Sequence, residues 1–195
     1  MVDQLIEWDK KLLLFLNGFH VSWLDPIVLF ATETFVWLPL YLFLLYILIR
    51  TYKKDVWIPL IGITLVIVLA DQITSGFMKP YFARLRPSQE PTLKGLVHLV
   101  DGYLGGLYGF ASSHAANTMG TATFFTLLLR STKPWIVWLF LWAVLLTYTR
   151  IYLGVHYPGD ITVGWLIGAG CGWTGFRVAK ALLAWNEKRR ASSTV

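Results

Sequence analysis

The sequence contains one cysteine and few charged residues, and both shortages narrow the possible class of protein. Cys171 is the only cysteine among 195 residues, so no intrachain disulfide can form and the redox compartment is not indicated. It lies in an apolar run, which favours a small buried hydrophobic side chain. Charged residues make up 14% of the chain, against about a quarter in soluble domains. This composition disfavours a soluble globular domain.

A basic leader, internal repeats and a single basic patch are also missing. The first 24 residues carry Asp3, Glu7 and Asp9 without a basic start, so we expect no signal peptide. The formal net charge of +6 could suggest nucleic acid as a partner. The basic residues are instead divided between the ends of apolar segments, so we expect no nucleic-acid binding. Without repeats or a composition break, one domain is expected.

What the sequence has in excess is apolar and aromatic residues, gathered in long runs. The chain is 56% hydrophobic, with ten Trp, nine Tyr and twelve Phe. A helix that crosses a membrane needs about 20 mostly apolar residues. The sequence therefore predicts an all-α integral membrane protein with about five transmembrane helices. The segments that qualify, some only with their flanks, are about 27–49, 56–78, 114–130, 134–150 and 160–184.

Basic residues divide unequally between the two sides of these predicted spans. Ten of the 17 Lys and Arg lie next to span ends on one side. They are Arg50, Lys53, Lys54, Arg130, Lys133, Arg177, Lys180, Lys188, Arg189 and Arg190. Short loops rich in Lys and Arg stay in the cytoplasm, so this side is predicted to be cytoplasmic. The other basic residues, predicted to face the periplasm or exterior, are Lys10, Lys11, Lys79, Arg84, Arg86, Lys94 and Arg150.

The two ends of the chain differ from the apolar middle. Residues 1–20 are too polar at the front to cross a membrane, and they predict an amphipathic helix that lies in the interface. We place this helix on the outer side. The predicted organisation is an interfacial segment at 1–24, a transmembrane domain at 25–186 and a cytoplasmic tail at 187–195.

The outer ends of the predicted spans carry polar residues that hydrocarbon does not favour. The second span ends at "KPYFARLRP", the third begins at "ASSHAAN", and "YTRIYLGVHYPGD" joins the fourth to the fifth. Charged groups at membrane depth are costly and tend to mark function. The candidate site residues on these stretches are Lys79, Arg86, Ser112, Ser113, His114, Arg150, His156 and Asp160.

These residue types favour phosphoryl transfer. A phosphoryl group in transfer carries negative charge on its non-bridging oxygens, and Lys79, Arg86 and Arg150 supply donors that offset it. The start of a helix presents free N–H groups and the positive end of the helix dipole. Ser112 and the backbone of Ser113 can therefore join the phosphate cradle.

Histidines can supply the covalent chemistry. One histidine attacks phosphorus, while a second gives a proton to the leaving oxygen and later activates water. Asp160 can hold the ring of His156 in the attacking tautomer, as the aspartate of a hydrolase triad does. Asp160 also follows "YPG" and precedes an apolar run, so it could cap the fifth span. The two roles are compatible.

The three stretches together resemble a known signature. "K-x6-RP", "SSH" and "R-x5-H-x3-D" are similar to the three motifs of the type 2 phosphatidic acid phosphatases, which include membrane lipid phosphatases and soluble vanadium haloperoxidases. The agreement covers about residues 55–185. The resemblance implies a helical-bundle phosphatase core, His156 as nucleophile, His114 as acid and base, and no metal or other cofactor. The usual Pro-Ser-Gly-His reads Ala111-Ser112-Ser113-His114, and Thr149 replaces a frequent serine.

Several polar residues keep an alternative interpretation. Arg150 could be an anchor at a span end. His156 and Asp160 have a spacing that metal ligands on a helix can have, but Pro158 and Gly159 argue against a continuous helix there. Four further features could belong either to the site or to the structure or surface of the protein. They are Arg84, Asp71, Glu33 and the segment 80–111.

On this interpretation the protein removes phosphate from a lipid at the outer face of the cytoplasmic membrane of a bacterium. The short chain and "SSHAAN" resemble the undecaprenyl-diphosphatase group, so undecaprenyl diphosphate is the predicted substrate. Phosphatidylglycerol phosphate, phosphatidic acid and lipid A phosphate are alternatives. A transporter or channel is the alternative from another class, but it would need charges spread through the depth of the spans. The expected partners are the lipid and the bilayer, and the oligomeric state is not indicated.

Overall fold

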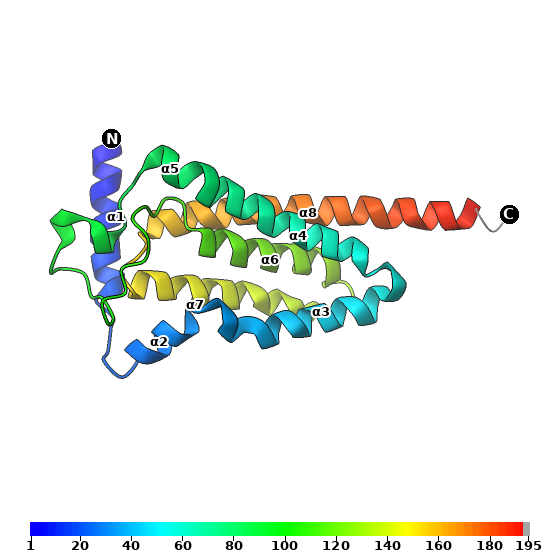
Figure 1. Cartoon of the computed structure of the whole chain (residues 1–195), viewed down its shortest axis with the longest axis horizontal. Helices are drawn as coiled ribbons and strands as arrows, with labels where there is room; N and C mark the ends of the chain where they lie inside the picture. Colours follow the sequence, from blue (N-terminus) through cyan, green and yellow to red (C-terminus); the bar gives the residue numbers. More distant parts are fainter. Residues whose placement is uncertain (193–195) are drawn as a thin grey trace.

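The computed structural model describes residues 1–192 as a helical bundle without a β-strand in that range (Figure 1). The α-helices are α1 (Val2–Asn17), α2 (Asp25–Ala31), α3 (Leu38–Tyr52), α4 (Trp57–Asp71), α5 (Lys79–Phe82), α6 (Ser113–Leu129), α7 (Leu139–Tyr152) and α8 (Pro158–Ser192). Short 3₁₀ turns cover Thr34–Trp37, Lys53–Asp55, Pro87–Gln89, Pro91–Leu93 and Pro134–Trp138, and Gln72–Met78 is π-helical. The all-α prediction is confirmed.

Helix α6 is the centre of the bundle and packs against α4, α7 and α8. The contact with α8 is close because glycines face it at Gly164, Gly168 and Gly172. A Cβ added at Gly168 would overlap the backbone of Ala116 on α6. Small residues let helix backbones approach within a membrane, where close packing drives association. The α6–α8 pair is therefore a closely packed support, with the second motif at the start of α6 and Asp160 of the third motif at the start of α8.

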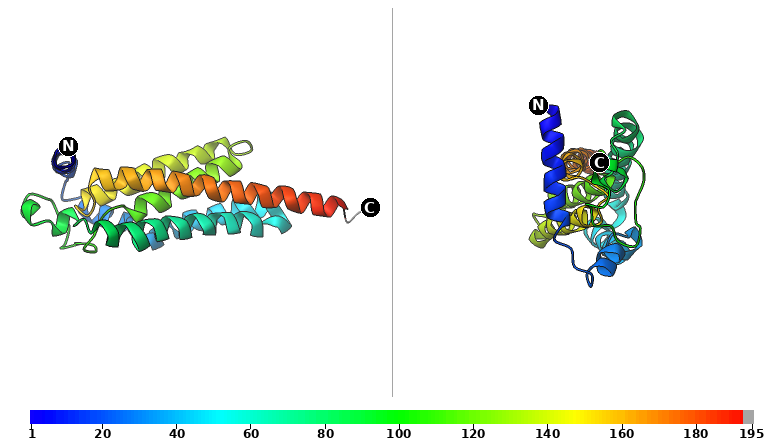
Figure 2. Two further views of the ribbon diagram at one scale, coloured as in Figure 1. Left: turned by 90° about the horizontal axis from the view of Figure 1, so that it is seen from above. Right: turned by 90° about the vertical axis from the view of Figure 1, so that its left-hand side faces the viewer.

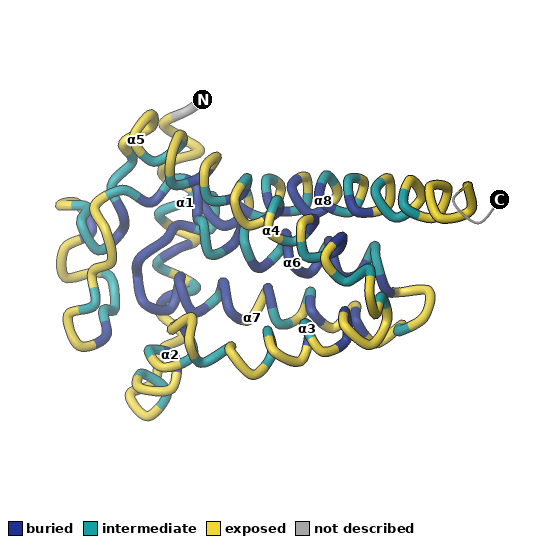
Figure 3. Tube along the Cα trace, turned by 45° about the vertical axis from the view of Figure 1, so that its right-hand side comes forward, coloured by how far each residue is buried: buried dark blue, intermediate teal, exposed yellow. Residues whose placement is uncertain are grey.

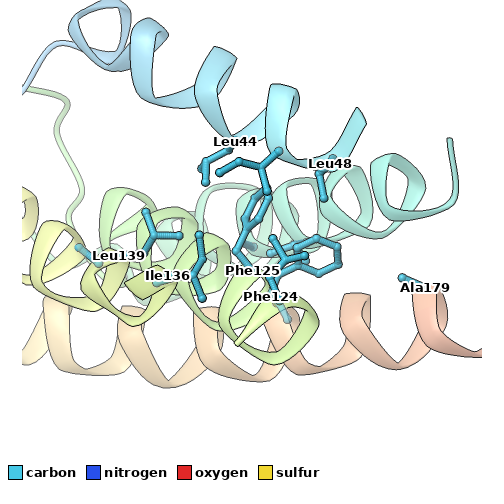
Figure 4. Close-up of a cluster of buried hydrophobic side chains, with 14 of the residues drawn as sticks. Leu44, Leu48, Phe124, Phe125, Ile136, Leu139 and Ala179 are labelled. Carbon is cyan, nitrogen blue, oxygen red and sulfur yellow. The ribbon is translucent and has the colours of Figure 1, made fainter. Parts of the chain in front are cut away.

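A second part of the core fills the space between α3, α6 and α7 (Figure 4). Phe124 and Phe125 of α6 are buried, and their rings meet edge to face with centroids 5.5 Å apart. The other buried side chains labelled in Figure 4 are Leu44, Leu48, Ile136, Leu139 and Ala179. The same cluster includes Ala70 of α4 and Ala116 of α6, so apolar packing continues along the bundle toward the end that carries the motifs.

Helical stretches that are long and apolar enough to cross a membrane are found at Thr34–Asp55, Trp57–Phe82 and Pro134–Tyr152 in the described residues. The first begins later than the predicted 27–49, because the helix breaks between α2 and the turn at Thr34. Helix α6, with 17 residues, and α8, with 35, run beside these three. The count of five spans stays a prediction.

The two ends of the bundle are built differently (Figures 1 and 2). One end carries α1, which runs across the bundle rather than along it, and the loop between α5 and α6. At the other end α8 continues past its neighbours as a single exposed helix (Figure 3). Residues 187–192 of the predicted tail belong to this helix, and residues 193–195 lie outside the described part of the chain.

Candidate active site

The three motifs meet at the end of the bundle that carries α1. Lys79 begins α5, Arg86 follows in the loop, and Arg150 lies in the last turn of α7. The loop after α7 carries His156, and Asp160 lies in the first turn of α8. His114, at the start of α6, lies close enough to Lys79, Arg86, Arg150 and His156 for their charges to act on it. Residues from Lys79 to Asp160, 81 positions apart in the sequence, thus form one cluster.

His156 and Asp160 form a buried pair. The Nδ1 atom of His156 lies 3.3 Å from Oδ2 of Asp160, and the side chains are 1% and 0% exposed. The same carboxylate oxygen accepts a hydrogen bond of 3.1 Å from the N–H of Tyr157. Because a carboxylate accepts, the ring proton belongs on Nδ1, which leaves the lone pair on Nε2. This is the tautomer in which Nε2 can attack.

The surroundings of His156 disfavour its protonated form. Burial lowers the pKa of His156 well below its usual value of 6.5, and the positive charges of Arg86, Arg150 and Lys79 lower it further. A neutral ring keeps its Nε2 lone pair at neutral pH. The charges that lower this pKa are the same ones that would attract a phosphate group.

The two arginines of the cluster are buried with donors to spare. Arg86 is 8% exposed and donates from Nε to the carbonyl of Tyr108 at 3.2 Å. Arg150 is 3% exposed and donates to the hydroxyls of Thr32 and Tyr103 at 2.5 and 3.2 Å. In the described chain, Nη1 of Arg86 and Nε of Arg150 are buried without a hydrogen-bond partner. Buried charged donors without partners are costly, so these two indicate a site for an anionic ligand.

Lys79 is oriented by two serine hydroxyls. Its Nζ atom lies 3.0 Å from Oγ of Ser75 and 3.0 Å from Oγ of Ser113. Ser75 belongs to the π-helical segment Gln72–Met78, and such segments frequently lie at functional sites. Ser113, which replaces the family's glycine, therefore accepts a hydrogen bond from Lys79 through its hydroxyl oxygen and also keeps its backbone N–H. The contribution of Ser75 was not predicted, because the π-helical geometry has no clear signal in the sequence.

Ser112 has a different immediate role from the one predicted. It is the N-cap of α6 and is fully buried, and its hydroxyl oxygen accepts a hydrogen bond of 3.4 Å from the N–H of Ala115. Its own N–H donates to the carbonyl of Asp160 at 3.0 Å. Ser112 thus ties the start of α6 to the start of α8, while its hydroxyl proton remains available as a donor.

Arg84 is the residue of the first motif region that the sequence left undecided, and the structure gives it clear partners. Its Nη1 lies 2.7 Å from Oδ1 of Asp160, and its Nη2 lies 2.8 Å from Oδ2 of Asp9. Its guanidinium also covers the ring of Tyr157, 3.9 Å from the ring centroid. Asp9 was not predicted as a site neighbour, since a contact across 75 residues leaves no local pattern.

The loop between α5 and α6 lies directly against the cluster. A Cβ added at Gly109 would lie 3.0 Å from Asp160 and 3.5 Å from Nδ1 of His156. Gly105 has a φ of +65°, and a Cβ there would lie 2.6 Å from Nη1 of Arg86. Larger residues would therefore collide with the predicted phosphate-binding groups. Segment 80–111, for which the sequence left a site role and a surface role open, therefore lies in contact with the candidate site residues.

A cavity of about 490 Å³ is lined by His114 together with residues of α3, α4, α6 and α7. Polar groups of α6, including Asn117 and Thr121, line one side. The rest of its wall is mainly apolar and includes Leu44, Leu48, Ile63, Phe125 and Trp142. Among the described residues, no group of three His, Cys, Asp or Glu side chains is arranged to hold a metal ion. Metal independence remains a prediction.

An all-helical bundle with cationic, histidine and carboxylate groups gathered at one end is the arrangement expected of a membrane phosphatase. The model of the PAP2 superfamily matches residues 60–184 of the chain. The chain therefore belongs to the PAP2 superfamily, as its three motifs indicated. It is a membrane lipid phosphatase, a hydrolase of phosphoric esters.

Relatives from other organisms are similar over most of the chain. A lipid A 4′-phosphatase of Bacteroides thetaiotaomicron is 41% identical over 187 residues, which are 94% of this chain and 82% of the relative. A lipid A 4′-phosphatase of Porphyromonas gingivalis is 32% identical and covers 86% of this chain and 71% of its own length. An undecaprenyl-diphosphatase of Sulfolobus acidocaldarius is 34% identical and covers 89% and 78%.

Solved structures share the fold. The crystal structure of Aquifex aeolicus LpxE has a TM-score of 0.61 and 29% identity, with 86% of this chain and 93% of that chain covered. A transmembrane PAP2-type phosphatidylglycerolphosphate phosphatase from Bacillus subtilis has a TM-score of 0.64 and 22% identity, with 95% and 87% covered. The second likeness concerns the fold alone.

Proposed function

We propose that this protein is a lipid A phosphatase that acts through a phosphohistidine at His156. The observation that supports an anionic ligand most directly is the pair of buried, unpartnered donors on Arg86 and Arg150. The substrate assignment is supported by the 41% and 32% identical lipid A 4′-phosphatases. Undecaprenyl diphosphate, the substrate predicted from the sequence, is the second candidate because a 34% identical relative hydrolyses it.

The reaction begins with binding of the phosphate ester at the cationic cluster. Lys79, Arg86 and Arg150 offset the charge of the non-bridging oxygens, and Ser112 and the N–H of Ser113 complete the cradle. These donors stabilise the charge most strongly in the five-coordinate transition state, where it is largest around phosphorus.

Two displacements at phosphorus then follow. Nε2 of His156 forms a bond to phosphorus while the bond to the lipid oxygen breaks, and His114 gives that oxygen a proton. Asp160 stabilises the positive charge that develops on the ring of His156. His114 next takes a proton from water, whose oxygen attacks phosphorus as the bond to His156 breaks. Inorganic phosphate leaves, and both histidines return to their starting forms.

The cavity beside His114 supports a lipid as the carrier of the phosphate. Its mainly apolar wall suits a hydrocarbon chain, and burial of each CH₂ group contributes about 0.8 kcal/mol. An acylated sugar phosphate such as lipid A would place its phosphate at the cluster and one chain in this cavity.

A panel of lipid phosphates tests the substrate assignment. The purified protein in detergent is given bisphosphorylated lipid A, undecaprenyl diphosphate, phosphatidylglycerol phosphate and phosphatidic acid, and kcat/KM is measured by phosphate release. We expect lipid A to be turned over at least about tenfold better than the others, a difference of about 1.4 kcal/mol. A tenfold preference for undecaprenyl diphosphate would restore the sequence-based assignment. Activity that persists in His156→Ala would contradict the mechanism.

The proposed location is the cytoplasmic membrane of a bacterium, with the site at the outer face. The basic turns at 50–55 and 130–133 and the end of α8 lie at the opposite end of the bundle, as the charge distribution predicted. Thr132→Cys in a Cys171→Ala background should resist a membrane-impermeant thiol reagent in intact cells and react after lysis. Labelling in intact cells would show the opposite orientation.

A further inference from the structure

A line of charged groups connects the nucleophile to the first helix. His156 contacts Oδ2 of Asp160 at 3.3 Å, and Oδ1 of that carboxylate accepts from Arg84 at 2.7 Å. The other terminal nitrogen of Arg84 donates to Oδ2 of Asp9 at 2.8 Å. The second oxygen of Asp9 accepts a hydrogen bond of 2.8 Å from the N–H of Gly159. Asp9 therefore holds both the guanidinium and the backbone that carries Asp160.

The Asp160 carboxylate is the most deeply buried of these groups, and its two neighbours are partly buried. The Asp160 side chain is 0% exposed, that of Arg84 is 24% exposed and that of Asp9 is 14% exposed. A buried carboxylate needs a charged partner with good geometry, and a long arginine side chain needs a second contact to hold one rotamer. Asp9 supplies that second contact.

Helix α1 is fixed against the same loop by further contacts. Leu13 of α1 is fully buried. The side chain of Asn17, 2% exposed, donates to the carbonyls of Ile151 and Tyr152 at 3.1 and 2.8 Å. These carbonyls belong to the end of α7, just before the loop that carries His156. The position of α1 is therefore coupled to the loop at both Asp9 and Asn17.

We propose that Asp9 and Arg84 are positioning residues for the His156–Asp160 pair. Helix α1 thereby contributes a residue, Asp9, that orients the active site. Arg84 fixes the Asp160 carboxylate at the orientation in which Oδ2 faces Nδ1 of His156, and Asp9 fixes Arg84. This inference rests on the proposed role of His156 as nucleophile. It gives α1 a function beyond the interfacial anchor that the sequence predicted.

The proposal differs from a purely structural role in what it predicts for the kinetics. Asp9 is separated from the ring of His156 by Arg84 and Asp160, so its loss should slow the chemical step without weakening substrate binding. Misplacement of a reacting group by about 1 Å can cost about 10²-fold in rate. A helix that served only for folding would instead change the melting temperature or the yield, with kcat of the folded fraction unchanged.

The test compares Asp9→Asn with Glu7→Gln on the same helix. Both changes remove one negative charge from α1, but among the described residues the ion-pair partner of Glu7 is Lys10 of the same helix, at 3.3 Å, and the Glu7 side chain is 61% exposed. We expect Asp9→Asn to lower kcat by about 10-fold to 10²-fold with KM within about twofold, and to raise the Ki of vanadate in parallel. Glu7→Gln should match the wild type. Asp9→Glu, which keeps the charge, should recover part of the loss.

Each outcome decides the question. If wild-type protein releases phosphate and folded Asp9→Asn keeps its kcat, the positioning role is wrong while the phosphatase mechanism stands. If the His156→Ala variant is as active as the wild type, the proposed role of His156 as nucleophile is wrong, and the positioning role that depends on it is wrong as well. If Asp9→Asn does not fold, Arg84→Lys replaces it: lysine keeps the charge but cannot bridge two carboxylates in a fork, so kcat should fall at unchanged KM. Full activity of folded Arg84→Lys would overturn the proposal.

Discussion

Both ends of this bundle are rich in arginine and lysine, but the two ends treat these residues differently. At the site, Arg86 and Arg150 are 8% and 3% exposed, and each has a buried nitrogen without a partner in the described chain. At the opposite end, the side chain of Arg190 is 43% exposed and meets Asp55 at 2.6 Å. The arginines at the two ends are the same type of residue. They differ in that the site arginines are buried and incompletely hydrogen-bonded, whereas Arg190 is exposed and paired.

The difference has a physical reason. An exposed cation is stabilised by water and contributes mainly to the sidedness of the protein. A buried cation has lost that hydration and destabilises the fold unless an anion replaces it. The exposed arginines at the far end also lie over aromatic rings, as Arg177 does over Trp173 and Arg189 over Trp185. Among the described residues, the buried cationic donors without a hydrogen-bond partner belong to Arg86 and Arg150 at the site end.

The largest expected difference between the two ends is in activity, when one arginine is removed at the site and, in a second variant, one at the far end. Arg150→Ala should lower kcat/KM by at least about 10²-fold, because a charge contact in the transition state is lost. Arg130→Ala, an exposed arginine at the end of α6, should leave kcat/KM within about twofold, as a change away from the site does. Phosphate release from the preferred lipid measures both. Equal losses in the two variants would remove the distinction between the ends.

The pH profile gives a second way to sharpen the comparison. The pKa of His156 is lowered well below 6.5 by burial and by the charges of Arg86, Arg150 and Lys79. Its ring should therefore stay neutral as the pH falls through 6.5, and kcat/KM should begin to fall only at more acidic pH. In Lys79→Gln one of these positive charges is gone, so the pKa of His156 rises and the acidic limb moves to higher pH. An acidic limb that stays at the same pH in Lys79→Gln would contradict this environment for His156.

The helix pair that supports the site offers a third comparison, now between two glycines of α8. A Cβ at Gly168 would overlap the backbone of Ala116, whereas nothing lies within 4 Å of a Cβ at Gly170. Gly168→Ala should lower the stability by about 1–3 kcal/mol through overpacking. Gly170→Ala should be neutral or stabilise by up to about 1 kcal/mol through helix propensity. Thermal unfolding in detergent distinguishes the two variants, and equal melting temperatures would show that α6 and α8 can separate.

The overall character of the site was predictable from the sequence because it depends on short local patterns. Long apolar runs gave the helices, and three motifs at their ends gave a cluster that includes Lys79, His114 and His156. Each motif carries its own spacing, so convergence at one end follows once the spans alternate across a membrane. The division of basic residues between the two ends followed from the same alternation.

The parts that were not predicted depend on contacts distant in sequence or on departures from regular helix. Asp9 reaches Arg84 across 75 residues. Thr32 lies at the break that shortens the first predicted span, and this break lets its hydroxyl contact Arg150. Ser75 reaches Lys79 from the π-helical segment. None of these has an amphipathic or motif signature, because single polar residues acquire partners only in the folded chain.

The smallest expected effect tests the far end directly. Asp55 accepts from Arg190 at 2.6 and 2.7 Å and from Asn186 at 2.9 Å, which ties the turn after α3 to the end of α8. The Arg190 side chain is 43% exposed and that of Asp55 is 21% exposed, so salt and hydration reach this ion pair and weaken it. Arg190→Ala should therefore leave kcat and KM unchanged and lower the melting temperature only slightly, with Arg190→Lys between the variant and the wild type. The measurement is turnover and unfolding of the three proteins at low and high salt. A tenfold fall in kcat for Arg190→Ala would mean that the far end acts on the site through α8, since α8 is the element that joins Arg190 to Asp160.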